Sequence, residues 1–385
     1  MCDPFAGSGT TLLEARLLGL GALGIEICPL SVLISKTKSQ FPSTTASLER
    51  TAAGLRQFYE QRWSEVVRRR DAQKLSHEDI VGEMKPFITP FPNLEKWLIP
   101  EALLGCSIVV EYAQQLSGYE KAAVCCALSA RMRSIGNVDV DVVRAEYSRR
   151  PRERVDVLGH VERSLHRLIV GIRETVVSHQ RLIAPRDSVK VIKGSLLATS
   201  IPPNSVDYIV TSPPYGVESL SYLRTHLLSY RCLNAILKHD PYEVSDQFIG
   251  SEYSGNGKDI APDWRAGEAS RTFRRFFQNI WSTDKKLMAR STMMMKFFAE
   301  MVRVADQLHR WVRPEGRIAF VIGNKKIGEQ MIPTDVIIRE IFESRGLFFK
   351  RALKHKLKCN NSNSEVPWQE RIIQDEYVLL FSKAK

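Results

Sequence analysis

The sequence Thr-Ser-Pro-Pro-Tyr at residues 211–215 constrains the fold of this chain more than any other stretch. It directly follows Val206–Val210, an apolar run rich in β-branched residues that predicts a buried strand. Two consecutive prolines end that strand and prevent an immediate helix, so the backbone leaves in a stiff, extended loop. Because open α/β sheets bind ligands at the carboxyl ends of their strands, the sequence predicts an α/β fold with a functional loop here.

A glycine-rich loop near the N-terminus is the second informative stretch. Residues 3–11 read Asp-Pro-Phe-Ala-Gly-Ser-Gly-Thr-Thr. Glycines on both sides of a serine allow a tight turn and a close approach of the backbone to a ligand. We expect Thr10 and Thr11 to cap the helix predicted at 12–18, whose positive end would then face the ligand.

A predicted strand at 22–26 follows that helix and ends in the carboxylate of Glu26. An acidic side chain at this place suits a ribose, because both hydroxyls of the sugar can donate to it. The dinucleotide fingerprint G-x-G-x-x-G is incomplete, since no third glycine follows Gly9 in step. The pattern therefore argues against NAD and favours a smaller cofactor that contains adenosine.

Together the two stretches resemble the amino-methylating DNA methyltransferases, which modify cytosine N4 or adenine N6. The loop at 3–11 resembles their S-adenosyl-L-methionine loop, and Ser-Pro-Pro-Tyr resembles their catalytic loop in the form most often associated with cytosine N4. The resemblance implies a Rossmann-like methyltransferase sheet with helices on both faces, and S-adenosyl-L-methionine as the cofactor.

The matching positions give the candidate site residues. Catalytic roles fall to the four residues of the second loop: Ser212, Pro213, Pro214 and Tyr215. Cofactor binding falls to ten residues: Asp3, Phe5, Ala6, Gly7, Ser8, Gly9, Thr10, Thr11, Glu26 and Ser195. Ser195 follows a third predicted strand at 189–193, where the family usually has an acidic residue that contacts the adenine; a serine there can still accept a hydrogen bond.

These residues suit direct methyl transfer to an exocyclic amine, and no metal is predicted. The lone pair of such an amine is delocalised into the base, so two acceptors aimed at its N–H bonds would free it. The Ser212 hydroxyl and the Pro213 carbonyl are the candidates, and Tyr215 would stack on the base. The base must be flipped out of double-stranded DNA to reach them. A serine at 212 favours cytosine N4 over adenine N6.

The middle of the chain interrupts the α/β alternation. We assign residues 1–35 and 187–385 to a methyltransferase catalytic domain and residues 36–186 to a mostly helical insertion. Apolar residues recur at helical spacing within the insertion. It is either a DNA-recognition cap or a structural lid or dimer surface.

The charge of the chain favours a polyanionic partner. Lys and Arg number 55 against 43 Asp and Glu, which gives a net charge of +12. Two basic clusters are candidates for DNA contact, although such runs can also be solvated faces. One consists of Arg131, Arg133, Arg144, Arg149, Arg150, Arg152 and Arg154. The other consists of Arg271, Arg274, Arg275, Lys285 and Lys286, beside Phe273, Phe276, Phe277 and Trp281.

The remaining composition excludes several classes of protein. No apolar run reaches the ~20 residues of a membrane helix, and no signal peptide precedes the first motif. The seven cysteines form no C-x-x-C pair, which favours reduced thiols in a cytoplasmic protein over a zinc site or disulfide framework.

Only two residues precede Asp3, yet a strand should lead into the glycine loop. We therefore expect a truncated first strand, with a missing N-terminal segment or an upstream polypeptide that completes it. Three alternatives to a DNA methyltransferase stay open: an RNA or tRNA base-amine methyltransferase, a protein amide methyltransferase, and a truncated, non-catalytic DNA-binding remnant. The recognition sequence, a restriction partner and the oligomeric state do not follow from these motifs.

Overall fold

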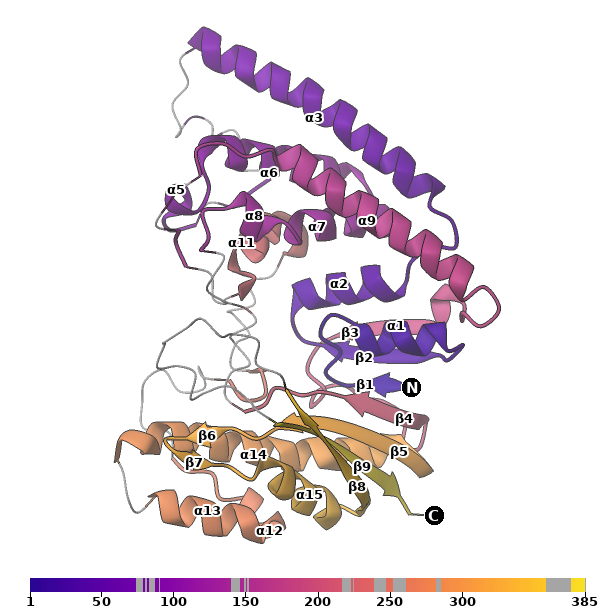
Figure 1. Cartoon of the computed structure of the whole chain (residues 1–385), viewed down its shortest axis with the longest axis vertical. Coiled ribbons are helices and arrows are strands. Elements are labelled where there is room, and N and C mark those ends of the chain that lie inside the picture. Colours follow the sequence, from indigo (N-terminus) through magenta and orange to yellow (C-terminus); the bar gives the residue numbers. More distant parts are fainter. Residues whose placement is uncertain are drawn as a thin grey trace.

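A computed structural model describes residues 1–73, 79, 82, 87–89, 91–139, 146–148, 150, 152–216, 223, 225–238, 247–251, 261–281, 285–357 and 375–384 (Figure 1). A seven-stranded sheet organises the lower half of the molecule, in the order β3-β2-β1-β4-β5-β9-β8. Its strands are β1 (Cys2–Asp3), β2 (Ala22–Glu26), β3 (Val189–Lys193), β4 (Val206–Thr211), β5 (Val312–Gly323), β8 (Leu347–Lys356) and β9 (Asp375–Lys383). Only β9 runs antiparallel to the other strands of this sheet.

This sheet confirms the predicted α/β, Rossmann-like class. From their sequences, residues 348–357 and 376–381 are also predicted to form a closing antiparallel pair, and this pair is present as β8 and β9. β1 has two residues and lies between β2 and β4, at the point where the strand order reverses. Ligands of open α/β sheets bind at such a point. The upstream segment expected from the sequence stays a prediction.

Helices cover both faces of the sheet. The chain steps from β1 to β3 in one direction and from β4 to β5 in the other, so right-handed crossovers place the two groups of helices on opposite faces. α1 (Thr10–Leu17) and α2 (Pro29–Ser39) lie on one side, and α14 (Lys285–Trp311) and α15 (Thr334–Ser344) on the other (Figure 1). α12 (Ala266–Ala269) and α13 (Arg271–Trp281) pack against α14 and α15. A hairpin of β6 (Lys326–Ile327) and β7 (Gln330–Met331) follows β5.

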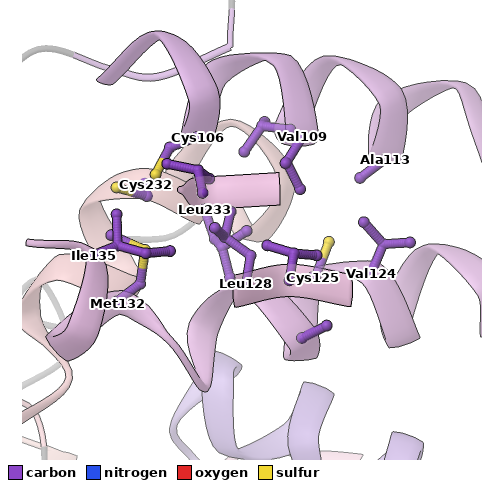
Figure 2. Close-up of a cluster of buried hydrophobic side chains, with 14 of the residues drawn as sticks. Cys106, Val109, Ala113, Val124, Cys125, Leu128, Met132, Ile135, Cys232 and Leu233 are labelled. Atoms are coloured by element: carbon purple, nitrogen blue, oxygen red, sulfur yellow. The ribbon is translucent and has the colours of Figure 1, made fainter. Parts of the chain in front are cut away.

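The predicted helical insertion forms a separate layer above the sheet (Figure 1). Its helices are α3 (Ala46–Gln73), α5 (Leu94–Trp97), α6 (Pro100–Gln115), α7 (Gly118–Ser129), α8 (Met132–Ile135) and α9 (Val157–Ser178). α11 (Leu227–Leu237), which follows the catalytic loop in the chain, packs into the same core. Figure 2 shows Cys232 and Leu233 of α11 among Cys106, Leu128 and Ile135 of the insertion. The helical layer therefore consists of the insertion together with α11, which comes from the catalytic part of the chain.

A buried arginine joins the two ends of the insertion. The guanidinium of Arg16 in α1 donates to the carbonyls of Ser39 (2.9 Å) and Phe41 (3.0 Å), where the insertion begins, and of Ala184 (3.1 Å), where it ends. The same group lies 4.2 Å from the ring centroid of Phe41. A planar cation with five N–H donors can satisfy three carbonyls at once, so the insertion is anchored to the catalytic sheet at both ends.

Two further observations concern the described residues. No helix among them is long and apolar enough to cross a membrane. Cys359 lies outside the described residues, and the other six cysteines are free thiols, five of them buried.

Candidate active site

A cavity of about 320 Å³ lies at the carboxyl ends of β1, β2 and β4, where both predicted loops meet. Such a volume is at the lower end of the range for small-molecule sites. Five predicted cofactor residues line it: Phe5, Gly7, Ser8, Glu26 and Ser195. Three predicted catalytic residues also line it: Ser212, Pro213 and Pro214. Segments about 200 positions apart in the sequence thus share one chamber.

The glycine loop turns as its sequence predicts, but its helix starts differently. Gly7 and Gly9 have φ of 50° and 78°, the left-handed region that favours glycine. Gly9 is the N-cap of α1 and no side chain caps that helix, so the prediction that Thr10 and Thr11 cap it is wrong. The Thr10 hydroxyl instead accepts from Nζ of Lys38 (2.8 Å). The Thr11 side chain hydrogen-bonds to Asp3.

Gly9 also permits close packing behind the loop. A Cβ atom at this position would lie 2.8 Å from Cα of Ser35 in α2, a distance that real side chains do not reach. A Cβ at Gly7 would meet nothing nearer than the Phe5 carbonyl oxygen at 3.9 Å. Gly9 therefore serves the packing of α1 on α2, whereas Gly7 lines the cavity.

Glu26 faces the cavity in a fixed orientation. Its Oε2 accepts the amide of Gly7 (2.8 Å), and its Oε1 accepts the amide of Cys28 (2.8 Å). Burial raises the pKa of this carboxyl, and the hydrogen bonds from the backbone of Cys28 and Gly7 lower it. A carboxylate has about four acceptor positions, so two donated N–H groups leave room for two ligand hydroxyls.

Asp3 is buried and does not line the cavity. Its side chain is 3% exposed, and its Oδ1 accepts from the Thr211 hydroxyl (2.7 Å) and the Phe5 amide (3.1 Å). Burial raises the pKa of this carboxyl, and the bond from Thr211 lowers it. Asp3 thus ties the glycine loop to the last residue of β4. Five predicted cofactor residues do not line the cavity: Asp3, Ala6, Gly9, Thr10 and Thr11.

The catalytic loop presents its serine to the cavity and turns its tyrosine toward the sheet. Ser212 is exposed, and its hydroxyl lies 3.1 Å from the Tyr215 hydroxyl. The Tyr215 hydroxyl donates to Oε1 of Glu376 at the start of β9 (3.0 Å). Tyr215 packs against the sheet core and is absent from the cavity lining. Its predicted role as a stacking surface stays a prediction.

Sequence reasoning missed the wall that the helical layer contributes. Leu223, His226 and Phe248 line the cavity together with Gln247 and Ile249. Leu223 and Phe248 belong to the core of the helical layer, whereas Ile249 belongs to the core of the sheet. Burial, with the nearby charge of Arg133, lowers the pKa of His226, which favours the neutral imidazole over the charged one. The sequence predicts a helix at 219–236, and that pattern gives position 226 no functional role. No local signal marks such a residue, because tertiary packing brings it to the site.

The basic clusters are partly structural. In the first, Nε of Arg131 donates to the Ser164 hydroxyl (2.7 Å), and Nε of Arg152 donates to the Gly136 carbonyl (3.2 Å). Arg144 and Arg149 lie outside the described residues, whereas Arg150 and Arg154 are exposed.

The second cluster surrounds α13, and two of its aromatic residues belong to the core. Phe273 and Phe277 are fully buried beneath α14 and α15, so they cannot stack on bases. Arg274 donates to the Gly267 carbonyl (2.9 Å). Lys285, Lys286 and Trp281 have side chains outside the described part of the chain.

Comparison with known proteins gives two relatives that align with nearly the whole chain. The Type II methyltransferase M.BsoBI of Geobacillus stearothermophilus is 25% identical over 397 residues, covering 94% of this chain and 75% of that protein. The Type II methyltransferase M.MvaI of Kocuria varians is 22% identical over 398 residues, covering 99% and 83%. The resemblance to DNA methyltransferases, predicted from the two loops, is confirmed by these relatives.

Other comparisons add little. No family model matches the chain. A solved structure described as a DNA modification methylase of Thermus thermophilus is 17% identical and covers 49% of each chain, with a TM-score of 0.23. That score is too low to support an argument.

Proposed function

We propose that this chain is a site-specific DNA methyltransferase, which transfers a methyl group from S-adenosyl-L-methionine to the exocyclic amine of a flipped base in double-stranded DNA. The observation that carries the proposal is the cavity lined by both the glycine loop and Ser212–Pro214. The two Type II methyltransferases that align with the chain support it. The net charge of +12 suits a polyanionic substrate.

The cofactor side of the cavity has the groups that S-adenosyl-L-methionine requires. Glu26 is oriented by two backbone amides and can accept both ribose hydroxyls. Gly7, Ser8 and Ser195 border the same space. Bound there, S-adenosyl-L-methionine supplies an electrophilic methyl group.

The catalytic loop supplies hydrogen-bond acceptors for the target amine. Ser212 is exposed to the cavity, and Pro213 holds its carbonyl in a stiff backbone. Acceptors on both N–H bonds keep the nitrogen closer to tetrahedral and make its lone pair available. Holding the amine in line with the methyl group converts a bimolecular reaction into a positioned one.

We favour cytosine N4 over adenine N6 as the methylated position. The support is the serine at 212, because the Ser-Pro-Pro-Tyr loop resembles the form most often associated with cytosine N4. The helical layer, which contributes His226 and Phe248 to the cavity, is the candidate for the DNA-recognition cap.

Transfer of a labelled methyl group to unmethylated genomic DNA tests the proposal, since such DNA contains every short recognition sequence. Nucleoside mass spectrometry then identifies the product. We expect label in 4-methylcytosine, incorporated about a hundredfold or more slowly by a Ser212→Ala variant that still binds the cofactor. Label in 6-methyladenine would support DNA methyltransferase activity but contradict cytosine N4 as the methylated position. Label in RNA but not in DNA would overturn the DNA substrate, and cofactor binding without any transfer would support the non-catalytic alternative.

A further inference from the structure

A carboxylate from the last strand of the sheet reaches the catalytic loop. Glu376 lies 161 positions after Tyr215 in the chain, and its Oε1 accepts the Tyr215 hydroxyl at 3.0 Å. The Tyr215 hydroxyl in turn lies 3.1 Å from the Ser212 hydroxyl. Three polar side chains therefore form one hydrogen-bonded chain, with Ser212 at its cavity end.

The chemistry of the three groups fixes the direction of this chain. Tyr215 has a single hydroxyl hydrogen, and it donates this hydrogen to Oε1 of Glu376. The phenol oxygen then has only lone pairs left for Ser212. The Ser212 hydroxyl must donate to Tyr215, and its own lone pairs are left to face the cavity.

The antiparallel direction of β9 makes this arrangement possible. β4 and β5 end at the edge of the sheet where the catalytic loop leaves β4, whereas the antiparallel β9 begins at that same edge. Glu376 pairs with Gly323, the last residue of β5. A shift of one residue in this pairing would turn Glu376 to the other face of the sheet.

We propose that Glu376 is a positioning residue that holds the Ser212 hydroxyl as a hydrogen-bond acceptor toward the substrate amine. The inference rests on the proposed function, since it deepens the role of the same site. A hydrogen-bond acceptor at this position can accept from the exocyclic amino group of cytosine or adenine. It repels the carbonyl oxygen that uracil or hypoxanthine has in place of that amino group. Glu376 thereby selects amino-bearing bases through Tyr215 and Ser212, without touching the base.

Kinetics of Glu376→Ala, Tyr215→Phe and the double variant test this proposal. Either single change frees the Ser212 hydroxyl to rotate, so we expect kcat to fall about tenfold while the cofactor Kd and Tm stay unchanged. Because both changes break one chain, the double variant should lose about tenfold as well, and not about a hundredfold. A double variant whose loss of kcat is the product of the two single losses would contradict the inference. Full activity of Glu376→Ala would contradict it as well. Neither result would contradict the proposed function, provided that the wild type is active.

Asp375→Ala is the matched control on the same strand. Asp375 is the neighbour of Glu376 but pairs with Nζ of Lys354 (2.9 Å) at the surface. We expect unchanged kcat for this variant. If Glu376→Ala does not fold, Tyr215→Phe, which removes a single oxygen atom, provides the same measurement.

A binding experiment separates this inference from the proposed function, because it needs no turnover. Deoxycytidine and deoxyuridine are titrated against the wild type and Glu376→Ala in the presence of S-adenosylhomocysteine, with deoxyadenosine and deoxyinosine as the second pair. We expect the wild type to prefer the amino member of one pair at least fivefold, and Glu376→Ala to lose that preference. Equal binding of both members by the wild type would refute the inference, whatever the outcome of the methylation assay.

Discussion

The cofactor side and the catalytic side of the cavity are held in place by different kinds of contact. On the cofactor side, backbone amides of Gly7 and Cys28 orient Glu26. On the catalytic side, the Ser212 hydroxyl is oriented by the side chains of Tyr215 and Glu376. Amides are present whatever the side chain, whereas hydroxyls and carboxylates are lost by a single substitution. The cofactor side is therefore sensitive mainly to backbone geometry, and the catalytic side to the identity of its side chains.

The largest effect is expected from Ser212→Ala, which tests the catalytic side. The variant removes one acceptor that faces the substrate amine while the loop keeps its two prolines. We expect kcat to fall by about a hundredfold or more, the size typical of removing one preorganised hydrogen-bonding group. Single-turnover kinetics with labelled cofactor, together with calorimetric cofactor binding, would measure both quantities. A comparable loss of cofactor affinity would contradict the separation of the two sides.

Gly9→Ala tests the dependence of the cofactor side on backbone geometry. The new Cβ would lie 2.8 Å from Cα of Ser35, at a φ of 78° that L-residues rarely adopt. We expect the free energy of unfolding to fall by about 2–4 kcal/mol from crowding and backbone strain. Gly7→Ala is the matched control, because its Cβ meets only the Phe5 carbonyl oxygen, at 3.9 Å. Equal losses in urea unfolding would show that packing against α2 is irrelevant.

The pH dependence of cofactor affinity in the wild type and in Glu26→Gln tests the role of the Glu26 carboxylate on the cofactor side. An amide cannot accept from both backbone N–H groups, so we expect cofactor affinity to fall roughly tenfold, the lower limit for a hydrogen bond to a charged group. Burial raises the pKa of Glu26 above its usual value of 4.5. The carboxylate therefore gains its proton at a higher pH than an ordinary glutamate, and wild-type affinity should decline with falling pH before an ordinary glutamate would become protonated. A decline of equal size in Glu26→Gln would assign the pH effect to another group.

The smallest effect is expected outside the cavity, at the exposed Arg154. Arg154→Ala would remove one contact to a DNA phosphate. We expect the variant to bind DNA about two- to threefold more weakly at moderate salt, and the slope of log K against log salt concentration to fall by about one. Arg131→Ala is the contrasting variant, because Arg131 donates to Ser164 and should affect Tm more than the salt slope. An unchanged salt slope for Arg154→Ala would remove this residue from the DNA-binding surface.

The sequence predicted what depends on short stretches of chain. Both loops, the carboxylate of Glu26 and the closing strand pair were recognisable because turn residues and strand periodicity are local signals. The capping prediction for Thr10 and Thr11 failed because Gly9 takes the N-cap position in a left-handed conformation.

Other parts of the site had no local signal. His226 reaches the cavity only because α11 packs into the helical layer. Glu376 reaches the catalytic loop only through the pairing of β9 with β5. A prediction of either contact requires the register of elements far apart in the chain, which periodicity within each element does not contain.

The place of Glu376 in the last strand has a consequence for the timing of biosynthesis. Ser212 and Tyr215 are translated 161 or more positions before the carboxylate that orients them. At roughly 5–20 residues per second, that interval lasts about 8 to 32 seconds. The glycine loop and the catalytic loop have then left the ribosome, but the serine lacks its orienting partner. A nascent chain can assemble the cofactor side of the cavity early, and it acquires a complete catalytic side only when its last strand has been made.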